Sequence, residues 1–150
     1  MKVDRVLREF VEECKKRFGE NLVSVVLFGS YARGEQKKTS DLDLLVVVKD
    51  LPMVWSERKK QFEEICESLS KKYGKFIEVI PITTKELRKN LNKKSPFFIT
   101  FVLGHKIVFD DGTFKKEFEK FSLELSKKNF VYYEGGRKWE IKKEALKYLH

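Results

Sequence analysis

The chain has 150 residues, of which 41% are hydrophobic, enough to bury a single core. It carries 32 basic and 23 acidic side chains, and the net charge of +9 allows attraction to polyphosphate, RNA or an acidic partner without choosing among them. It has no apolar run of about 18 residues and no charged-then-apolar leader, so neither a membrane span nor a signal peptide is predicted, and a cytoplasmic location is expected.

Apolar residues at helical spacing predict a first helix that ends near Gly19. The stripe consists of Val3, Val6, Leu7, Phe10, Val11 and Cys14. Residues 22–28 (LVSVVLF) then predict a buried strand, because they are short, β-branched and nearly all apolar. Cys14 and Cys66 each lie on the apolar stripe of a predicted helix, which favours buried thiols over a disulfide or a metal site.

Gly29 and Ser30 follow this strand directly. A glycine at a sharp turn lets backbone N–H groups approach a phosphate, and Ser30 adds a hydroxyl donor. Residues 31–34 could begin a helical turn whose N-terminus favours an anion. The alternative for a glycine-serine pair after a strand is an ordinary turn.

Two aspartates open the next apolar segment (DLDLLVVV), which predicts a second buried strand. Asp41 and Asp43 project to the same face, because side chains alternate along a strand. Two such carboxylates repel one another unless a cation lies between them, and Mg²⁺ prefers oxygen ligands of this kind. The alternative is that the two aspartates are solvated loop acids or a cap. Because they follow a glycine-serine turn at this spacing, a nucleotide site is favoured over that alternative.

A second helix is predicted up to Gly74, followed by a third strand over 76–82. The helical stripe consists of Phe62, Ile65, Cys66, Leu69 and Tyr73. Glu78 is the lone acid in the strand, and burying it unpaired would be costly, so we expect it to face the metal site. The alternative is an edge-strand glutamate that faces water.

The remaining chain predicts further helices and strands around the same core. A helix is predicted over 84–91, with Thr83 or Thr84 as its cap, and the apolar stretch that begins at Ser95 is expected to cover the nucleotide or an interface. A later helix carries Phe114, Phe118, Phe121 and Leu125 on one face, which indicates core contacts more than a base-stacking platform.

Gly135-Gly136 lies between two aromatic segments, 130–134 and 137–141, and predicts a hairpin. An isolated hairpin is marginal in water, so docking on its own domain is expected, while binding of RNA or a partner stays open. The predicted organisation is a core over 1–110 and an extension over 111–150 that packs on it. His105 and His150 form no ligand cluster.

Gly29-Ser30, Arg33-Gly34 and the segment 40–44 (SDLDL) resemble the signature of the polymerase-β-type nucleotidyltransferases. The resemblance is strongest to their minimal, MNT-type branch, whose members are often encoded beside a HEPN-domain partner. The motif covers residues 29–44, and a looser correspondence extends over 3–110. The resemblance implies an α/β (α+β) fold in which a mixed sheet is flanked by helices.

The resemblance also implies a reaction: in-line displacement on the α-phosphate of a nucleoside triphosphate, with ATP as the expected donor. The implied catalytic and metal-binding residues are Asp41, Asp43 and Glu78, which would hold two Mg²⁺ ions. The implied nucleotide-binding residues are Gly29, Ser30, Arg33 and Ser40, of which Ser40 also shapes the turn. The family more usually has aspartate where this chain has Glu78.

Three functions follow for such a chain. The first is transfer of AMP to a hydroxyl, by resemblance a tyrosine of a HEPN toxin, which makes the chain an antitoxin. The second is nucleotidylation of a small molecule such as an aminoglycoside. The third is a non-catalytic module that binds a nucleotide or a toxin, and the retained acids argue against it. The sequence does not identify the oligomeric state.

Overall fold

The computed structural model describes residues 2–129, 131–134 and 136–149. In this part of the chain, helices and strands are interspersed as far as α5, and a hairpin and short helices follow. Their order is α1 (Lys2–Phe18), η1 (Gly19–Asn21), β1 (Leu22–Phe28), β2 (Leu42–Val48), α2 (Trp55–Tyr73), β3 (Ile77–Thr83), α3 (Thr84–Asn92), α4 (Pro96–Val102), β4 (Lys106–Asp110), α5 (Thr113–Ser126), β5 (Val131–Glu134), β6 (Arg137–Glu140), α6 (Ile141–Ala145) and η2 (Leu146–Tyr148).

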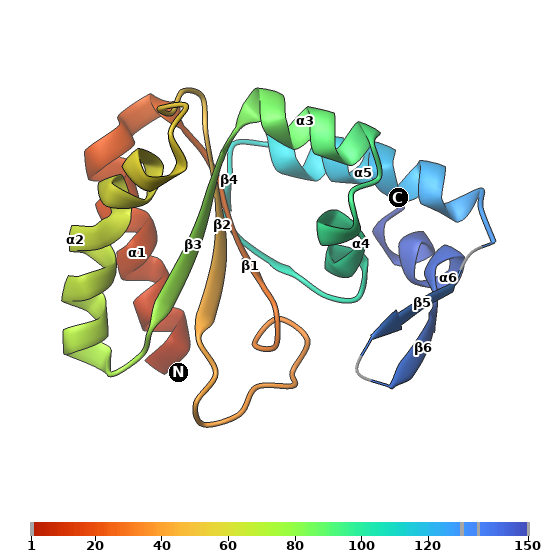
Figure 1. The fold of residues 1–150 in the computed structure, drawn as a ribbon, viewed down its shortest axis with the longest axis horizontal. Helices are drawn as coiled ribbons and strands as arrows, with labels where there is room; N and C mark the ends of the chain where they lie inside the picture. Colours follow the sequence, from red (N-terminus) through yellow and green to blue (C-terminus); the bar gives the residue numbers. More distant parts are fainter. Residues whose placement is uncertain (1, 130, 135, 150) are drawn as a thin grey trace.

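A mixed sheet with the strand order β3-β2-β1-β4 forms the centre of the molecule. Strands β2 and β3 are parallel, whereas β1 is antiparallel to both β2 and β4. Helices α1 and α2 cover one face, and α3, α4 and α5 lie on the other (Figure 1). The predicted α/β fold, a mixed sheet flanked by helices, is therefore confirmed.

Each face of the sheet has its own hydrophobic core. Leu44 and Val46 of β2 pack with α1 and α2 in the first core, and Leu45 and Val47 of the same strand pack with α3 to α6 in the second. Because both faces of β2 are covered, its sequence is almost continuously apolar rather than alternating.

The predicted helix ends are confirmed by their caps. Helix α2 stops at Gly74, whose left-handed backbone (φ 67°) lets its N–H donate to the Ser70 carbonyl. Helix α3 begins with Thr83, whose side chain accepts from the Glu86 N–H while the Glu86 carboxylate accepts from the Thr83 N–H. Thr83, not Thr84, is thus the cap. No described helix is long and apolar enough to cross a membrane.

The apolar stretch after Ser95 forms α4, and its Phe98, Phe101 and Val102 are buried in the second core; that this stretch covers the nucleotide or an interface stays a prediction. The buried aromatic face of α5 agrees with its prediction as a core helix.

The β5–β6 hairpin packs on the second core through Tyr132 and Trp139, as docking on its own chain predicts. Helix α6 follows, with Ile141 and Ala145 fully buried. Phe130, Gly135 and His150, which the sequence places in or beside this extension, lie outside the described residues.

Candidate active site

The motif residues meet at one end of the sheet, where β1 finishes and β2 begins. Phe28, the last residue of β1, pairs with Asp43 of β2. Beyond it the chain closes a hydrogen-bonded turn, in which the Arg33 N–H donates to the Gly29 carbonyl (3.2 Å) and the Glu35 N–H donates to the Ser30 carbonyl (2.9 Å). No helix begins at residues 31–34, so the expected helix dipole is replaced by a single turn.

Gly29 is the point of closest approach between the turn and the acidic strand. Its backbone is left-handed (φ +76°), and a Cβ placed there would lie 2.3 Å from Oδ2 of Asp43. A side chain on Gly29 would force the Asp43 carboxylate to move. The glycine of the motif therefore brings the backbone directly against Asp43, as well as relieving the turn of strain.

The acidic residues approach one another from adjacent strands. Asp43 lies directly opposite Glu78 in the parallel β2–β3 pair, which puts both side chains on the face of the second core. Asp41 precedes β2 and is exposed. Burial raises the pKa of the half-buried Asp43, the charges of Asp41 and Glu78 raise it further, and Arg33 opposes them. The three carboxylates and one guanidinium thus share one electrostatic environment.

Glu78 lies on an edge strand and is partly exposed to solvent. Strand β3 is at the edge of the sheet, and the Glu78 side chain is 52% exposed and lies 2.5 Å from Nζ of Lys59 on α2. The alternative of an edge-strand glutamate describes these surroundings correctly. At the edge of the sheet, the carboxylate of Glu78 is exposed to solvent and can approach a lysine of the helix beside the sheet. Lys59 was not expected here, since it is one of many exposed lysines and its sequence gives no sign of the partner.

The donor set suits a hard cation, although the acids are not gathered tightly. Within the described ranges, no group of three or more His, Cys, Asp or Glu side chains is close enough to hold a metal ion. Asp41, Asp43 and Glu78 nevertheless offer only carboxylate oxygens, the ligands that Mg²⁺ prefers. The pKa of Asp43 is raised first by burial and then by the charges of Asp41 and Glu78, and a nearby cation would offset both effects.

Arg33 is held from two sides. Its Nε lies 3.1 Å from Oε1 of Glu35, and its side chain is only 18% exposed. Gly104 lies behind it, where an added Cβ would be 3.2 Å from the Arg33 Cγ. Glu35 is two residues from Arg33 in the same loop, so this contact is local, whereas nothing in the sequence connects Gly104 to the motif, because its contact forms only when the α4–β4 turn meets the β1–β2 loop.

Ser40 is part of the turn that precedes β2. Its hydroxyl accepts from the Lys37 N–H (2.8 Å), and its own N–H donates to the Lys37 carbonyl (3.0 Å). This hydroxyl is engaged with the backbone, which agrees with the turn-shaping role. Binding of the nucleotide by Gly29, Ser30, Arg33 and Ser40 stays a prediction.

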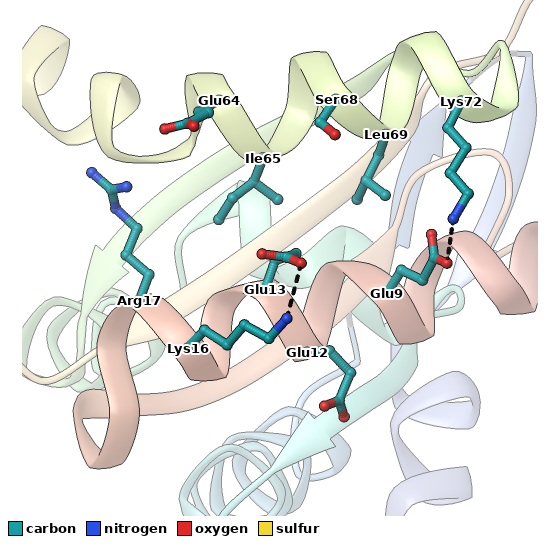
Figure 2. A pocket seen from close by; sticks show the side chains of 10 residues that line it. All are labelled: Glu9, Glu12, Glu13, Lys16, Arg17, Glu64, Ile65, Ser68, Leu69 and Lys72. Atoms are coloured by element: carbon teal, nitrogen blue, oxygen red, sulfur yellow. Dashed lines mark hydrogen bonds and ion pairs between the residues drawn. The ribbon is translucent and has the colours of Figure 1, made fainter.

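A groove of about 650 Å³ lies away from the motif, between α1 and α2 (Figure 2). Ile65 and Leu69 point into it from α2. Acidic and basic side chains both line its walls, and two ion pairs lie among them, Glu9 with Lys72 at 2.8 Å and Glu13 with Lys16 at 3.5 Å. Mutually neutralised charges give this groove no preference for an anionic ligand, so the motif end of the sheet is the better candidate site.

The fold and the glycine-serine, Asp-x-Asp motif together define the chain as a nucleotidyltransferase. It belongs to the family described as "Nucleotidyltransferase domain", whose model matches residues 7–109. The match ends before α5, so the hairpin is an addition to the part that the family model describes.

Two relatives named for the same activity are similar in sequence. A protein of Methanocaldococcus jannaschii, MJ1305, provisionally named a protein adenylyltransferase, is 32% identical over 140 residues, which cover 93% of this chain and 94% of the relative. The protein adenylyltransferase MntA of Thermococcus cleftensis is 36% identical over 67 residues, which cover 45% of this chain and 64% of that protein.

One solved structure shows the same fold. The spectinomycin adenyltransferase AAD(9) of Enterococcus faecialis, solved with ATP and spectinomycin, has a TM-score of 0.51 and 18% sequence identity, and the match covers 81% of this chain and 66% of that one. At this identity the likeness concerns the fold alone.

Proposed function

We propose that this nucleotidyltransferase transfers AMP from ATP to an acceptor hydroxyl with the help of Mg²⁺. The observation that carries the proposal is the contact of the Gly29 backbone with Asp43, directly opposite Glu78. A turn suited to phosphate therefore lies against a pair of acids at one end of the sheet. The names of the relatives, protein adenylyltransferases, support ATP as donor.

Each residue has a role that follows from its position. The turn at Gly29 and Ser30 would receive the phosphates, and Arg33 would neutralise their charge. Asp41, Asp43 and Glu78 would hold Mg²⁺, which when bound stabilises the negative charge of the reacting phosphate. Glu78 would act on the acceptor side by accepting the proton of the attacking hydroxyl, for which its carboxylate must leave Lys59.

The acceptor that we propose is a tyrosine of a toxin protein of the HEPN type, so that the chain acts as an antitoxin. The support comes from the resemblance to MNT-type proteins and from relatives named for modification of proteins. A small-molecule acceptor of the aminoglycoside kind is the alternative, and the experiment below separates the two.

The test is incubation with Mg²⁺ and α-labelled ATP, with and without the protein encoded by the adjacent gene, followed by intact-mass analysis. Addition of one or more AMP groups to that protein supports the proposal. The addition should disappear with the double variant Asp41→Asn, Asp43→Asn and with replacement of the modified tyrosine of the partner by phenylalanine.

Two results would contradict the proposal in different ways. Binding of ATP without transfer to the partner protein, but with transfer to an aminoglycoside, would make the chain a small-molecule enzyme. Transfer that persists in the double variant would remove Asp41 and Asp43 from the reaction.

A further inference from the structure

Glu35 lies between two guanidinium groups that come from distant parts of the chain. Its Oε1 is 3.1 Å from Nε of Arg33, and its Oε2 is 3.7 Å from Nη1 of Arg137. The backbone N–H of Glu35 also donates to the Ser30 carbonyl (2.9 Å). Arg137 of the β5–β6 hairpin therefore reaches the same turn that the motif uses.

The hairpin places Arg137 beside Trp139. Arg137 and Trp139 are two residues apart on β6, so their side chains share a face, and the Arg137 guanidinium lies 4.1 Å from the centre of the Trp139 ring. Trp139 in turn packs on the second core together with its cross-strand partner Tyr132. In Figure 1 the hairpin lies on the same side of the molecule as the loop between β1 and β2.

We propose that Arg137 is a second guanidinium for the triphosphate, contributed by the C-terminal extension. This inference rests on the proposed function, because it assumes that the site binds a nucleoside triphosphate. Arg137 lies beyond residues 7–109, the part matched by the family model, so it would be an addition of this chain to the phosphate-binding turn.

Two arginines that converge on one carboxylate present the same donors that bind a phosphate group. Glu35 lies near both arginines, and a triphosphate carries more negative charge than one carboxylate. The Arg33 side chain is 18% exposed and fixed, whereas Arg137 is 64% exposed and can turn toward an arriving ligand. Arg33 would thus provide a fixed contact and Arg137 a closing one.

The test compares Arg137→Ala with Lys138→Ala. Lys138 is the next residue, is exposed and faces away from Trp139, so its replacement removes the same charge without touching the turn. Calorimetry would measure the dissociation constants of α,β-methylene-ATP, which cannot release pyrophosphate, and of AMP, both with Mg²⁺. We expect Arg137→Ala to weaken binding of the triphosphate about tenfold and of AMP less than about twofold, and Lys138→Ala to change neither by more than about twofold.

Arg33→Ala separates failure of this inference from failure of the proposed function. If Arg33→Ala weakens triphosphate binding while Arg137→Ala behaves as Lys138→Ala, Arg137 is no phosphate ligand and the proposed function stands. If the unmodified chain binds no triphosphate, the proposed function itself fails. Equal weakening by Arg137→Ala and Lys138→Ala would also overturn the inference, because it would reflect general charge alone.

Discussion

The carboxylate of Asp43 lies against the backbone of Gly29, so closely that a Cβ on Gly29 would be 2.3 Å from Oδ2. The two elements of the motif, a turn after one strand and an acid on the next, are therefore packed against each other. A side chain added at Gly29 would therefore displace the Asp43 carboxylate.

We expect Gly29→Ala to lower turnover roughly 100-fold, because a displacement of about 1 Å in a catalytic group has an effect of that size. Gly34→Ala is the matched control. Gly34 has nearly the same left-handed backbone (φ +70°, against +76° for Gly29), but a Cβ there meets nothing within 4 Å. Both variants carry the backbone strain of about 1–2 kcal/mol. The measurements are thermal unfolding and steady-state transfer, and equal loss of turnover in both variants would mean that strain alone matters.

Asp43→Asn should raise stability at pH 7 while it abolishes transfer. The pKa of Asp43 is raised in the folded protein, chiefly by burial, so its protonated form favours folding below the ordinary pKa of aspartate, and this contribution is lost as the pH rises through the folded pKa. A neutral asparagine removes the penalty of the charged form. Since Asp43 is only half-buried, we expect the substitution to raise the free energy of unfolding at pH 7 by no more than about 1 kcal/mol, which corresponds to roughly 2–4 °C in Tm.

Thermal unfolding of both proteins between pH 4 and pH 8 checks this expectation. The advantage of Asp43→Asn should shrink as the pH falls toward about 4, the ordinary pKa of aspartate. Asp50→Asn is the control, because Asp50 is an exposed aspartate that follows the opposite end of β2. If Asp43→Asn were less stable than the unmodified chain at pH 7, the charged form of Asp43 would not destabilise the folded protein as proposed.

Arg58 and Lys59 are neighbours on α2, but we expect only Arg58 to contribute strongly to stability. Arg58 is 3% exposed, forms two bonds to the Glu86 carboxylate (2.7 and 3.1 Å) and donates to the Pro52 carbonyl. Arg58→Met would leave these acceptors without a partner, and we expect a loss of about 2–3 kcal/mol. Lys59→Met removes only an exposed ion pair and should change stability by less than about 1 kcal/mol. Denaturant unfolding measures the stability of both variants. Equal losses would contradict the stabilising role given to the buried contacts of Arg58.

Most of the fold could be predicted from local patterns. The ends of α2 and α3 follow from Gly74 and Thr83, because a left-handed cap and a capping box are encoded within a few residues. The two central strands were recognisable because burial on both faces makes them almost wholly apolar. The place of β3 at the sheet edge was not predictable, since strand order depends on how distant segments pack, and this decides the exposure of Glu78.

The candidate site was predictable only as far as its local motif. Gly29 and Asp43 are brought together by an adjacent pair of strands, so their spacing in the sequence already indicates the contact. Lys59, Gly104 and Arg137 reach the site from a helix, a turn and a hairpin that lie far away in the chain. No local pattern distinguishes them from other lysines, glycines and arginines on the surface.

Glu78→Gln should lower turnover more than it weakens nucleotide binding, because the proposed role of Glu78 is on the acceptor side. The amide keeps the size of the side chain but can neither accept a proton nor pair with Lys59 as an ion. We expect turnover to fall by about 100-fold or more, in line with the usual contribution of a general base, and the dissociation constant of ATP to change by less than about threefold. Lys59→Met is the control, since it breaks the same ion pair but leaves the carboxylate in place. Single-turnover transfer and calorimetry measure the two quantities, and unchanged turnover in Glu78→Gln would make Glu78 a structural residue of the sheet edge.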